Sequence, residues 1–309
     1  MRSESKRVNY LAEFSASLAD LGTFLPLVLG VLVVTSLDPV GVLFGFGVFA
    51  LVTGWVYRRP IPVQPMKAVA AMGIAGLLTA DSLIATSVVM GCVLLLFSRS
   101  DVLSRIRRYL PNSVMHGLKA SLAVSLVLAS EARLDWEWIQ VVVLLSGLIA
   151  LQWTPVKPLS ALILIVIGVS LWAPPEALFI KIDPSFPALV WPSIAAFASA
   201  LGDATLPQLI LTVTNALILT AVIAQSYFPE DAPRITEQRL ARTSGWANLL
   251  LAPFGALPMC HGAGGLVAHH ALGGRSGWTI GFFGLLCLLL GLGFGRGTVP
   301  LLAVIPGSV

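Results

Sequence analysis

Long apolar stretches follow one another along almost the whole sequence, and this feature limits the fold more than any other. Each stretch has roughly 15 to 20 residues, the length of helix that crosses about 30 Å of hydrocarbon. Of the 309 residues, 57% are hydrophobic and only 11% are charged, and the mean hydropathy is +0.89. A soluble domain has too little interior to hide so much apolar surface. We therefore expect an all-α polytopic membrane protein.

The apolar stretches divide the chain into about eleven or twelve expected segments. Two of them, at 60–79 and 258–273, are interrupted by proline and glycine. The region 174–206 is looser, and its residues 192–203 are expected to form a short interfacial helix. Continuous spans are expected at 11–36, 40–57, 82–98, 112–130, 139–153, 159–173, 207–228, 243–256 and 278–295, with a stub from residue 299.

Basic residues lie mainly between the spans, where they indicate topology. If the N-terminus is cytoplasmic, fourteen of the nineteen Lys and Arg residues fall inside, as the positive-inside rule expects. These are Arg2, Lys6, Arg7, Arg58, Arg59, Arg99, Arg105, Arg107, Arg108, Lys157, Arg234, Arg239, Arg242 and Arg275. The net charge of +4 therefore reflects topology and does not indicate nucleic-acid binding. The three cysteines have no paired spacing, so neither a disulfide framework nor a metal site is expected.

The sequence PIPVQPMKAVAA at residues 60–71 breaks the third apolar stretch. Its prolines lack a backbone N–H and clash with the preceding turn, so no helix can run through all three of them. A helix can begin only near Pro65, inside the membrane, and Lys67 then places a positive charge in its first turn. A lysine near the end of a span can also snorkel to the interface, which is the alternative interpretation.

A second break, LPMCHGAGGLVAHH at 257–270, repeats this pattern. The dipeptide Pro-Met occurs at 65–66 and at 258–259, and each copy follows a polar residue of an earlier span, Asp20 or Asn215, at nearly the same distance. An odd number of expected spans separates the two units, so the second unit is inverted relative to the first. Inverted repeats with discontinuous helices in corresponding positions are typical of secondary transporters whose site lies near the bilayer midplane.

Two helices that begin inside the membrane create a site suited to an anion. Their first N–H groups have no intrahelical partner, and hydrocarbon supplies none. Each N-terminus also carries roughly half a positive charge, which favours a bound anion. We expect the backbone N–H groups of residues 66–68 and 260–262 to hold it. The candidate substrate-binding residues are Gln64, Met66, Lys67, Ala68, Thr214, Asn215, Cys260, His261 and Gly262.

Some polar residues of the spans have a second interpretation. Asp20 is costly inside an apolar span and therefore indicates a function. Because a carboxylate repels an anion, we expect Asp20 to pair with Lys67 or to couple transport to protons. Glu13, near the inner end of the first span, is the other candidate for proton coupling. Thr214 and Asn215 can also form hydrogen bonds between helices.

Four motifs together resemble one transporter family. They are DLGTFLP at 20–26, PIPVQPMKAVAA at 60–71, LPQL with the following TVTN at 206–215, and PMCHGAGG at 258–265. These motifs are similar to those of the molybdate transporters of plants and bacteria, distant relatives of the sulfate permeases that lack their STAS domain. The resemblance implies the fold of the sulfate permeases and uracil permease, with two inverted halves of about seven spans and the substrate between the two broken helices.

The resemblance also implies the organisation of the chain. We expect a first repeat at 1–173 with a half helix at 65–79, an extracytoplasmic connector with an interfacial helix at 174–206, and a second repeat at 207–309 with a half helix at 258–273. The fold implies about fourteen segments, and this chain ends about two segments early. The second repeat is therefore expected to be C-terminally short.

The function implied by the resemblance is secondary active transport of molybdate, a tetrahedral oxyanion, by alternating access. Sulfate or another oxyanion is an alternative substrate, and a nucleobase permease on the same fold is another, although its site would use a buried carboxylate where this chain has Asn215. An enzyme built from Cys260, His261 and Asp20 lacks a nucleophile-base motif, so we expect no enzyme. We also expect no cofactor, no metal and no nucleic-acid partner. The expected setting is a symporter in the cell membrane with a cytoplasmic N-terminus, and the fold admits a homodimer.

Overall fold

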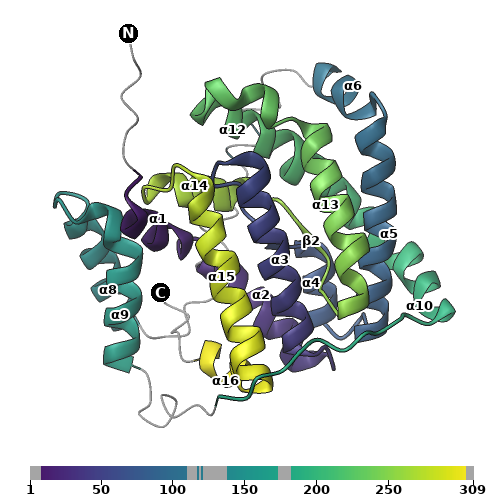
Figure 1. The fold of residues 1–309 in the computed structure, drawn as a ribbon, viewed down its shortest axis with the longest axis horizontal. Coiled ribbons are helices and arrows are strands. Elements are labelled where there is room, and N and C mark those ends of the chain that lie inside the picture. The colour runs from purple at the N-terminus through teal and green to yellow at the C-terminus, as the bar shows by residue number, and fades with distance from the viewer. Residues whose placement is uncertain (1–7, 110–116, 118–119, 121–137, 173–181, 304–309) are drawn as a thin grey trace.

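The computed structural model of the protein describes residues 8–109, 117, 120, 138–172 and 182–303 (Figure 1). Most of these residues are helical. The longer helices are α2 (Leu21–Val34), α3 (Pro39–Tyr57), α5 (Ala80–Arg99), α8 (Trp138–Leu151), α9 (Ser160–Trp172), α13 (Glu237–Leu251) and α15 (Gly277–Phe294). The shorter helices are α1 (Tyr10–Ser17), α4 (Lys67–Ile74), α6 (Val102–Tyr109), α10 (Ile194–Ser199), α11 (Thr205–Leu211), α12 (Thr220–Tyr227), α14 (Ala263–Ala271) and α16 (Thr298–Ala303). The expected span at 112–130 lies outside the described residues, except for Gly117 and Ala120.

Four helical segments of the described chain are long and apolar enough to cross a membrane, and a fifth is added if α1 and α2 form one bent span. The four are Pro39–Tyr57, Ala80–Arg99, Thr205–Tyr227 and Gly277–Leu302. They confirm the spans expected at 40–57, 82–98, 207–228 and 278–295. Helices α8 and α9 are apolar but shorter.

Helices α3 and α15 pack backbone to backbone, because glycines of both helices lie at their contact (Figure 1). A Cβ atom on Gly54 would lie 2.6 Å from the carbonyl oxygen of Gly277, and one on Gly284 would lie 2.7 Å from that of Gly47. Small residues allow this close approach in membranes, where helix association depends on packing.

The two breaks in the apolar stretches are confirmed, and they meet. Strand β1 (Gln64–Pro65) pairs antiparallel with strand β2 (Met259–Cys260). Met66 N–H extends the pairing by donating to the carbonyl oxygen of Pro258 at 2.8 Å. Helix α4 begins directly after β1 and α14 begins shortly after β2, so both half helices start from one short two-stranded sheet.

The first span is bent, although the sequence predicts one continuous span at 11–36. Helix α1 ends at Ser17, α2 begins at Leu21, and their axes differ by 43°. Asp20 lies in the bend as the residue before α2. The prediction of one unbroken helix is therefore wrong at this point. The break lies at Asp20, the acidic residue in the middle of the stretch.

At the short interfacial helix expected at 192–203 the structure has a longer helical stretch, and the interfacial position stays a prediction. The chain is helical from α10 through α11 to α12, joined by π-helical segments at Ala200–Ala204 and Thr212–Leu219. The backbone stays in the right-handed helical region at each junction. A π-helical turn adds a residue without ending the helix, so no break divides the expected connector from the second repeat at residue 206. The boundaries of the two repeats stay predictions.

Several basic residues that the sequence places on one side do lie together. Arg59 forms salt bridges with Glu230 at 2.6 Å and with Asp231 at 2.5 Å. Arg107 pairs with Glu237, which opens α13. The loops that follow α3 and α12 and the helix that follows α5 are therefore at the same end of the molecule (Figure 1).

Helices α8 and α9 stand beside the rest of the described chain (Figure 1). They meet it at α1, where the backbone N–H of Leu162 donates to Ser15 Oγ at 3.2 Å. The half helices are therefore surrounded mainly by α1 to α5 and α10 to α15, while the α8–α9 pair forms a separate arm.

Candidate functional site

Three buried groups meet where the two half helices begin. Gln64 in β1 is 1% exposed, and its Nε2 donates to Asp20 Oδ2 at 2.5 Å. The Gln64 carboxamide lies against Gly262, where a Cβ atom would be 1.8 Å from Gln64 Oε1. A glycine is therefore required at 262 by the close approach of Gln64, and the predicted site residues Gln64 and Gly262 are in contact.

The Asp20 carboxylate lies at the first turn of α14. A Cβ atom on Gly265 would be 2.5 Å from Asp20 Oδ2. The hydrogen bonds of the described residues include none from the backbone N–H groups of Ala263, Gly264 or Gly265. The bend of the first span thus brings a carboxylate to the positive end of a half helix, where negative charge is stabilised.

Lys67 lies in the first turn of α4 and is partly exposed. Within the described part of the chain its ammonium group makes no hydrogen bond or salt bridge, although it lies within electrostatic reach of Asp20. A cation within a membrane-spanning region normally pairs with another group. Lys67 therefore lies beside both breaks, and it has no close counterion among the described residues. Its role in binding stays a prediction.

The first backbone amides of α4 are not free, which departs from the expectation for residues 66–68. Met66 N–H bonds to Pro258, as described above, and Ala68 N–H donates to Gln208 Oε1 at 2.9 Å. Val69 N–H points to the same oxygen at 3.4 Å. Sequence reasoning missed Gln208 as a site residue. Its signal was the motif LPQL, which places a polar side chain in an apolar span.

His261 does not match its expected role as a donor to an anion, because both of its ring nitrogens are engaged. Nδ1 lies 2.9 Å from the carbonyl oxygen of Pro62, and Nε2 lies 2.8 Å from Thr243 Oγ1. A carbonyl only accepts, so in the neutral ring Nδ1 donates and Nε2 accepts from Thr243. Tyr57 Oη lies 2.8 Å from the same hydroxyl. The histidine is fully buried, bonds to the segment before β1 and to α13, and packs against aromatic rings of α3.

The remaining predicted substrate-binding residues differ in whether their side chains already form hydrogen bonds. Thr214 Oγ1 donates to the carbonyl oxygen of Ile210 in its own helix at 2.9 Å, so its hydroxyl hydrogen is already used. The Asn215 side chain makes no hydrogen bond to the described residues and is partly exposed. Cys260 is buried, and its thiol contacts Thr212. The Asn215 carboxamide is therefore able to bind a ligand, whereas the Thr214 hydroxyl already donates its hydrogen within its own helix.

Glu13 connects α1 to the start of α15. Among the described residues, none of its hydrogen bonds involves a residue at the meeting point of the half helices. Its carboxylate accepts from the backbone N–H groups of Arg275 and Ser276, both at 3.3 Å, and from the Thr279 hydroxyl. These groups belong to the start of α15. Glu13 thus caps a helix N-terminus, a structural task that the sequence did not reveal.

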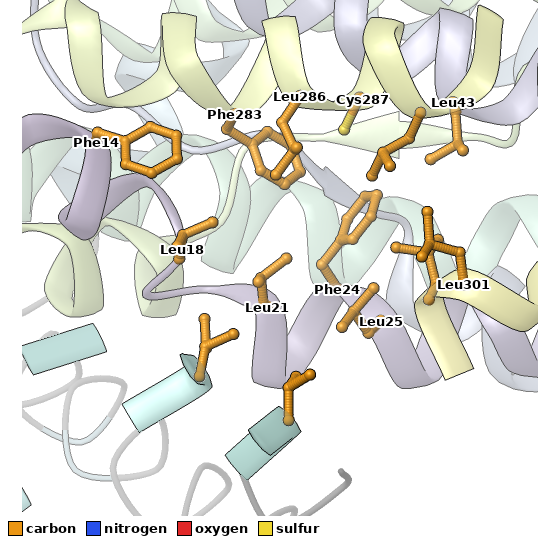
Figure 2. Close-up of a pocket in the computed structure, with 14 residues that line it drawn as sticks. Phe14, Leu18, Leu21, Phe24, Leu25, Leu43, Phe283, Leu286, Cys287 and Leu301 are labelled. Atoms are coloured by element: carbon orange, nitrogen blue, oxygen red, sulfur yellow. The ribbon is translucent and has the colours of Figure 1, made fainter. Parts of the chain in front are cut away.

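A pocket of about 320 Å³ lies beside the bent span (Figure 2). Leu18 and Leu21, which flank the bend, line it together with Phe24 and Phe283. All fourteen lining side chains are apolar. The pocket offers no donor to an anion, so the polar meeting point of the half helices is the better candidate site.

A sequence model of one family, described as "Molybdate transporter of MFS superfamily", matches residues 12–126 and 200–309. The chain belongs to this family. The matched ranges include Asp20, both half helices and Gln208. The geometry described above therefore lies within the part of the chain that defines membership of the molybdate transporter family.

Curated members of the molybdate transporter family align with nearly the whole chain. "Molybdate transporter 1" of Arabidopsis thaliana is 28% identical over 351 aligned positions, covering 97% of this chain and 76% of the relative. "Molybdate transporter 2" of the same plant is 26% identical, covering 96% of this chain and 74% of the relative. "Molybdate transporter 1" of Chlamydomonas reinhardtii is 26% identical, with coverages of 96% and 80%.

Solved structures show which fold this member of the molybdate transporter family has. The transmembrane domain of the cyanobacterial bicarbonate transporter BicA matches with a TM-score of 0.59 at 15% identity, covering 99% of this chain and 89% of that one. The murine Solute Carrier 26 family member A9, an anion transporter in an inward-facing state, matches with a TM-score of 0.61 at 11% identity, covering 98% and 60%. The protein is thus an all-α polytopic membrane protein with the inverted-repeat fold of the sulfate permease type.

Proposed function

We propose that the protein is a secondary active transporter of molybdate that works by alternating access. The observation that carries the proposal is Lys67, a cation at the point where two half helices begin that has no close counterion in the part of the chain that the structure describes. Membership of the molybdate transporter family and the similarity to anion transporters support it. A transporter needs no covalent chemistry, and His261 is not placed to activate Cys260 as a base, so we propose no enzymatic activity.

The electrostatics of the site favour a small, doubly charged oxyanion. Each half-helix N-terminus contributes roughly half a positive charge, and Lys67 contributes a full one. When Asp20 is protonated, the two ends and the lysine together match the two negative charges of molybdate. Tetrahedral oxyanions also present several oxygens at once, so one ion can accept from Lys67 of α4 and from the amides of α14 simultaneously.

The anion site includes Lys67, the free amides of α14 and the Asn215 side chain, with Gln64 shaping its wall. Gln64 donates to Asp20 and packs against Gly262, so its carboxamide keeps a defined position beside the start of α14. The half helices would move together against the α8–α9 arm and expose the site first to one side of the membrane and then to the other. The partners are the oxyanion and the lipid bilayer, and a homodimer stays a further proposal.

Proton coupling follows from the position of Asp20. A carboxylate at the first turn of α14 competes with an incoming dianion for the same positive end. Protonation removes that negative charge, so a proton and the anion would bind together, as in a symporter. With an N-terminus on the cytoplasmic side of the cell membrane, an inward proton gradient would drive uptake.

The binding of molybdate, tungstate and sulfate to the purified protein tests the proposal. We expect all three to compete for one site, with molybdate or tungstate ahead of sulfate. Lys67→Met should weaken molybdate binding at least about tenfold, because it removes a charge-assisted contact. The control is Lys157→Met, in the loop between α8 and α9, which should leave binding unchanged. Unaltered molybdate affinity in Lys67→Met would remove the lysine from the site, and competition by uracil but not by oxyanions would favour a nucleobase permease.

A further inference from the structure

Gln208 is the group that satisfies the positive end of α4 in this structure. It lies on α11 and is 1% exposed. Its Oε1 accepts from Ala68 N–H at 2.9 Å and from Val69 N–H at 3.4 Å, and its Nε2 donates to Thr212 Oγ1 at 2.9 Å. A helix that starts in the membrane needs such a partner, because hydrocarbon cannot hydrogen-bond its first amides.

The orientation of the Gln208 carboxamide follows from its partners. Backbone N–H groups only donate, so the atom that faces Ala68 must be the oxygen. The nitrogen then faces Thr212, whose hydroxyl can accept. Gln208 therefore presents a neutral oxygen to α4, in the place where an oxygen of a bound oxyanion would lie.

We propose that Gln208 is a displaceable cap of α4, and that an oxyanion binds by taking over the amides that Gln208 holds. This inference rests on the proposed function, since it specifies how the substrate enters that site. Hydrogen bonds to a charged acceptor are roughly twice as strong as those to a neutral one. A dianion therefore displaces the carboxamide oxygen, whereas water or a neutral solute gains too little to do so. Gln208 thus selects for charge.

The cap also sets the affinity, because its two hydrogen bonds must be given up when the anion binds. An isosteric side chain that cannot accept would leave the amides unpaired in the empty protein and so favour the anion. A carboxylate at the same position would hold the amides more strongly and would repel the anion. The two substitutions are expected to change affinity in opposite directions, which a purely structural role does not predict.

The test measures molybdate binding to purified protein together with thermal unfolding. Gln208→Met should lower the Kd about three- to tenfold, the range that the loss of competing hydrogen bonds implies. Its unfolding temperature should fall without molybdate and approach that of the wild type at saturating molybdate. Gln208→Glu should raise the Kd at least about tenfold.

Gln225→Met is the matched control. Gln225 lies on α12, in the same continuous helical stretch, and its Nε2 donates to the carbonyl oxygen of Ile235 at 2.8 Å. Its substitution should lower the unfolding temperature without changing the Kd. The control therefore separates a loss of stability from a change of affinity.

The outcomes distinguish this inference from the proposed function. If the wild type binds molybdate but Gln208→Met binds it equally or more weakly, the cap is overturned and the transporter stands. If the wild type binds none of the three oxyanions, both fail. Should Gln208→Met not fold, Gln208→Glu decides alone, since unchanged affinity with a carboxylate beside α4 contradicts the cap.

Discussion

At the scale of single residues, two carboxylates of the first span that look alike in the sequence have different surroundings. Asp20 lies beside Gln64 and the start of α14, within electrostatic reach of Lys67. Glu13 is saturated by donors from the start of α15. Of the two carboxylates, only Asp20 therefore lies beside the anion site that we propose.

This difference predicts the pH response of uptake. In proteoliposomes, wild-type molybdate uptake should rise when the outside is acidic, because protonation of Asp20 relieves its competition with the anion. Asp20→Asn should make uptake insensitive to the pH gradient. Glu13→Gln serves as the control and should keep the response, although it lowers stability. A persistent pH response in Asp20→Asn would assign coupling to another group.

His261 yields a second prediction at this scale. Both ring nitrogens are used by Pro62 and Thr243, so His261→Ala should leave buried partners unsatisfied and reduce stability by about 2–3 kcal/mol. The Kd for molybdate of the folded variant should change less than about threefold, since the ring does not face the anion. Thermal unfolding and binding of the same preparation check this. Lost binding with intact stability would instead place the imidazole at the substrate.

At the scale of elements, the sequence predicted the breaks better than the contacts. Three prolines before Lys67, and a proline with glycines around His261, forbid continuous helix, so both interruptions were predictable. The bend at Asp20 has no proline, and the helix from α10 to α12 continues through π-helical turns that have no sequence signature. The role of Gln208 depends on which helix lies next to α4. This neighbourhood belongs to the tertiary structure, and the hydrophobic periodicity of the sequence does not predict it.

The packing of α3 on α15 gives a prediction at the same scale. Gly284→Ala would place a methyl group 2.7 Å from the carbonyl oxygen of Gly47, so the helices must separate. We expect a loss of about 1–3 kcal/mol, as for other overpacked contacts. Gly281→Ala, one turn away on the same helix, meets no atom within 4 Å and should be neutral. Unfolding in detergent compares the two, and equal stability would show that this contact is not tight in the membrane.

At the scale of the whole molecule, the described chain consists of a large helical body and the α8–α9 arm. The arm meets the body at α1, where Ser15 receives the backbone N–H of Leu162. Alternating access requires that such a contact changes during the cycle. A cross-link between α1 and α9 should therefore prevent the arm from moving relative to the body.

A disulfide between Ser15→Cys and Leu162→Cys should block transport. We expect molybdate uptake to be lost after oxidation and restored by a reducing agent, while binding to the oxidised protein persists. Each single cysteine variant, treated in the same way, is the control. Full uptake by the cross-linked protein would mean that the arm and α1 travel together.

The pairing of β1 with β2 has a consequence for ion selectivity. Main-chain hydrogen bonds join the two helix starts, so the backbone fixes the distance between them. This distance does not adjust to the bound ion. Ions of equal charge but different radius would then be sorted by how well they span a fixed width. Side-chain substitutions around that gap can alter how tightly an ion is held, but a change in the preferred radius would require altering the strands themselves.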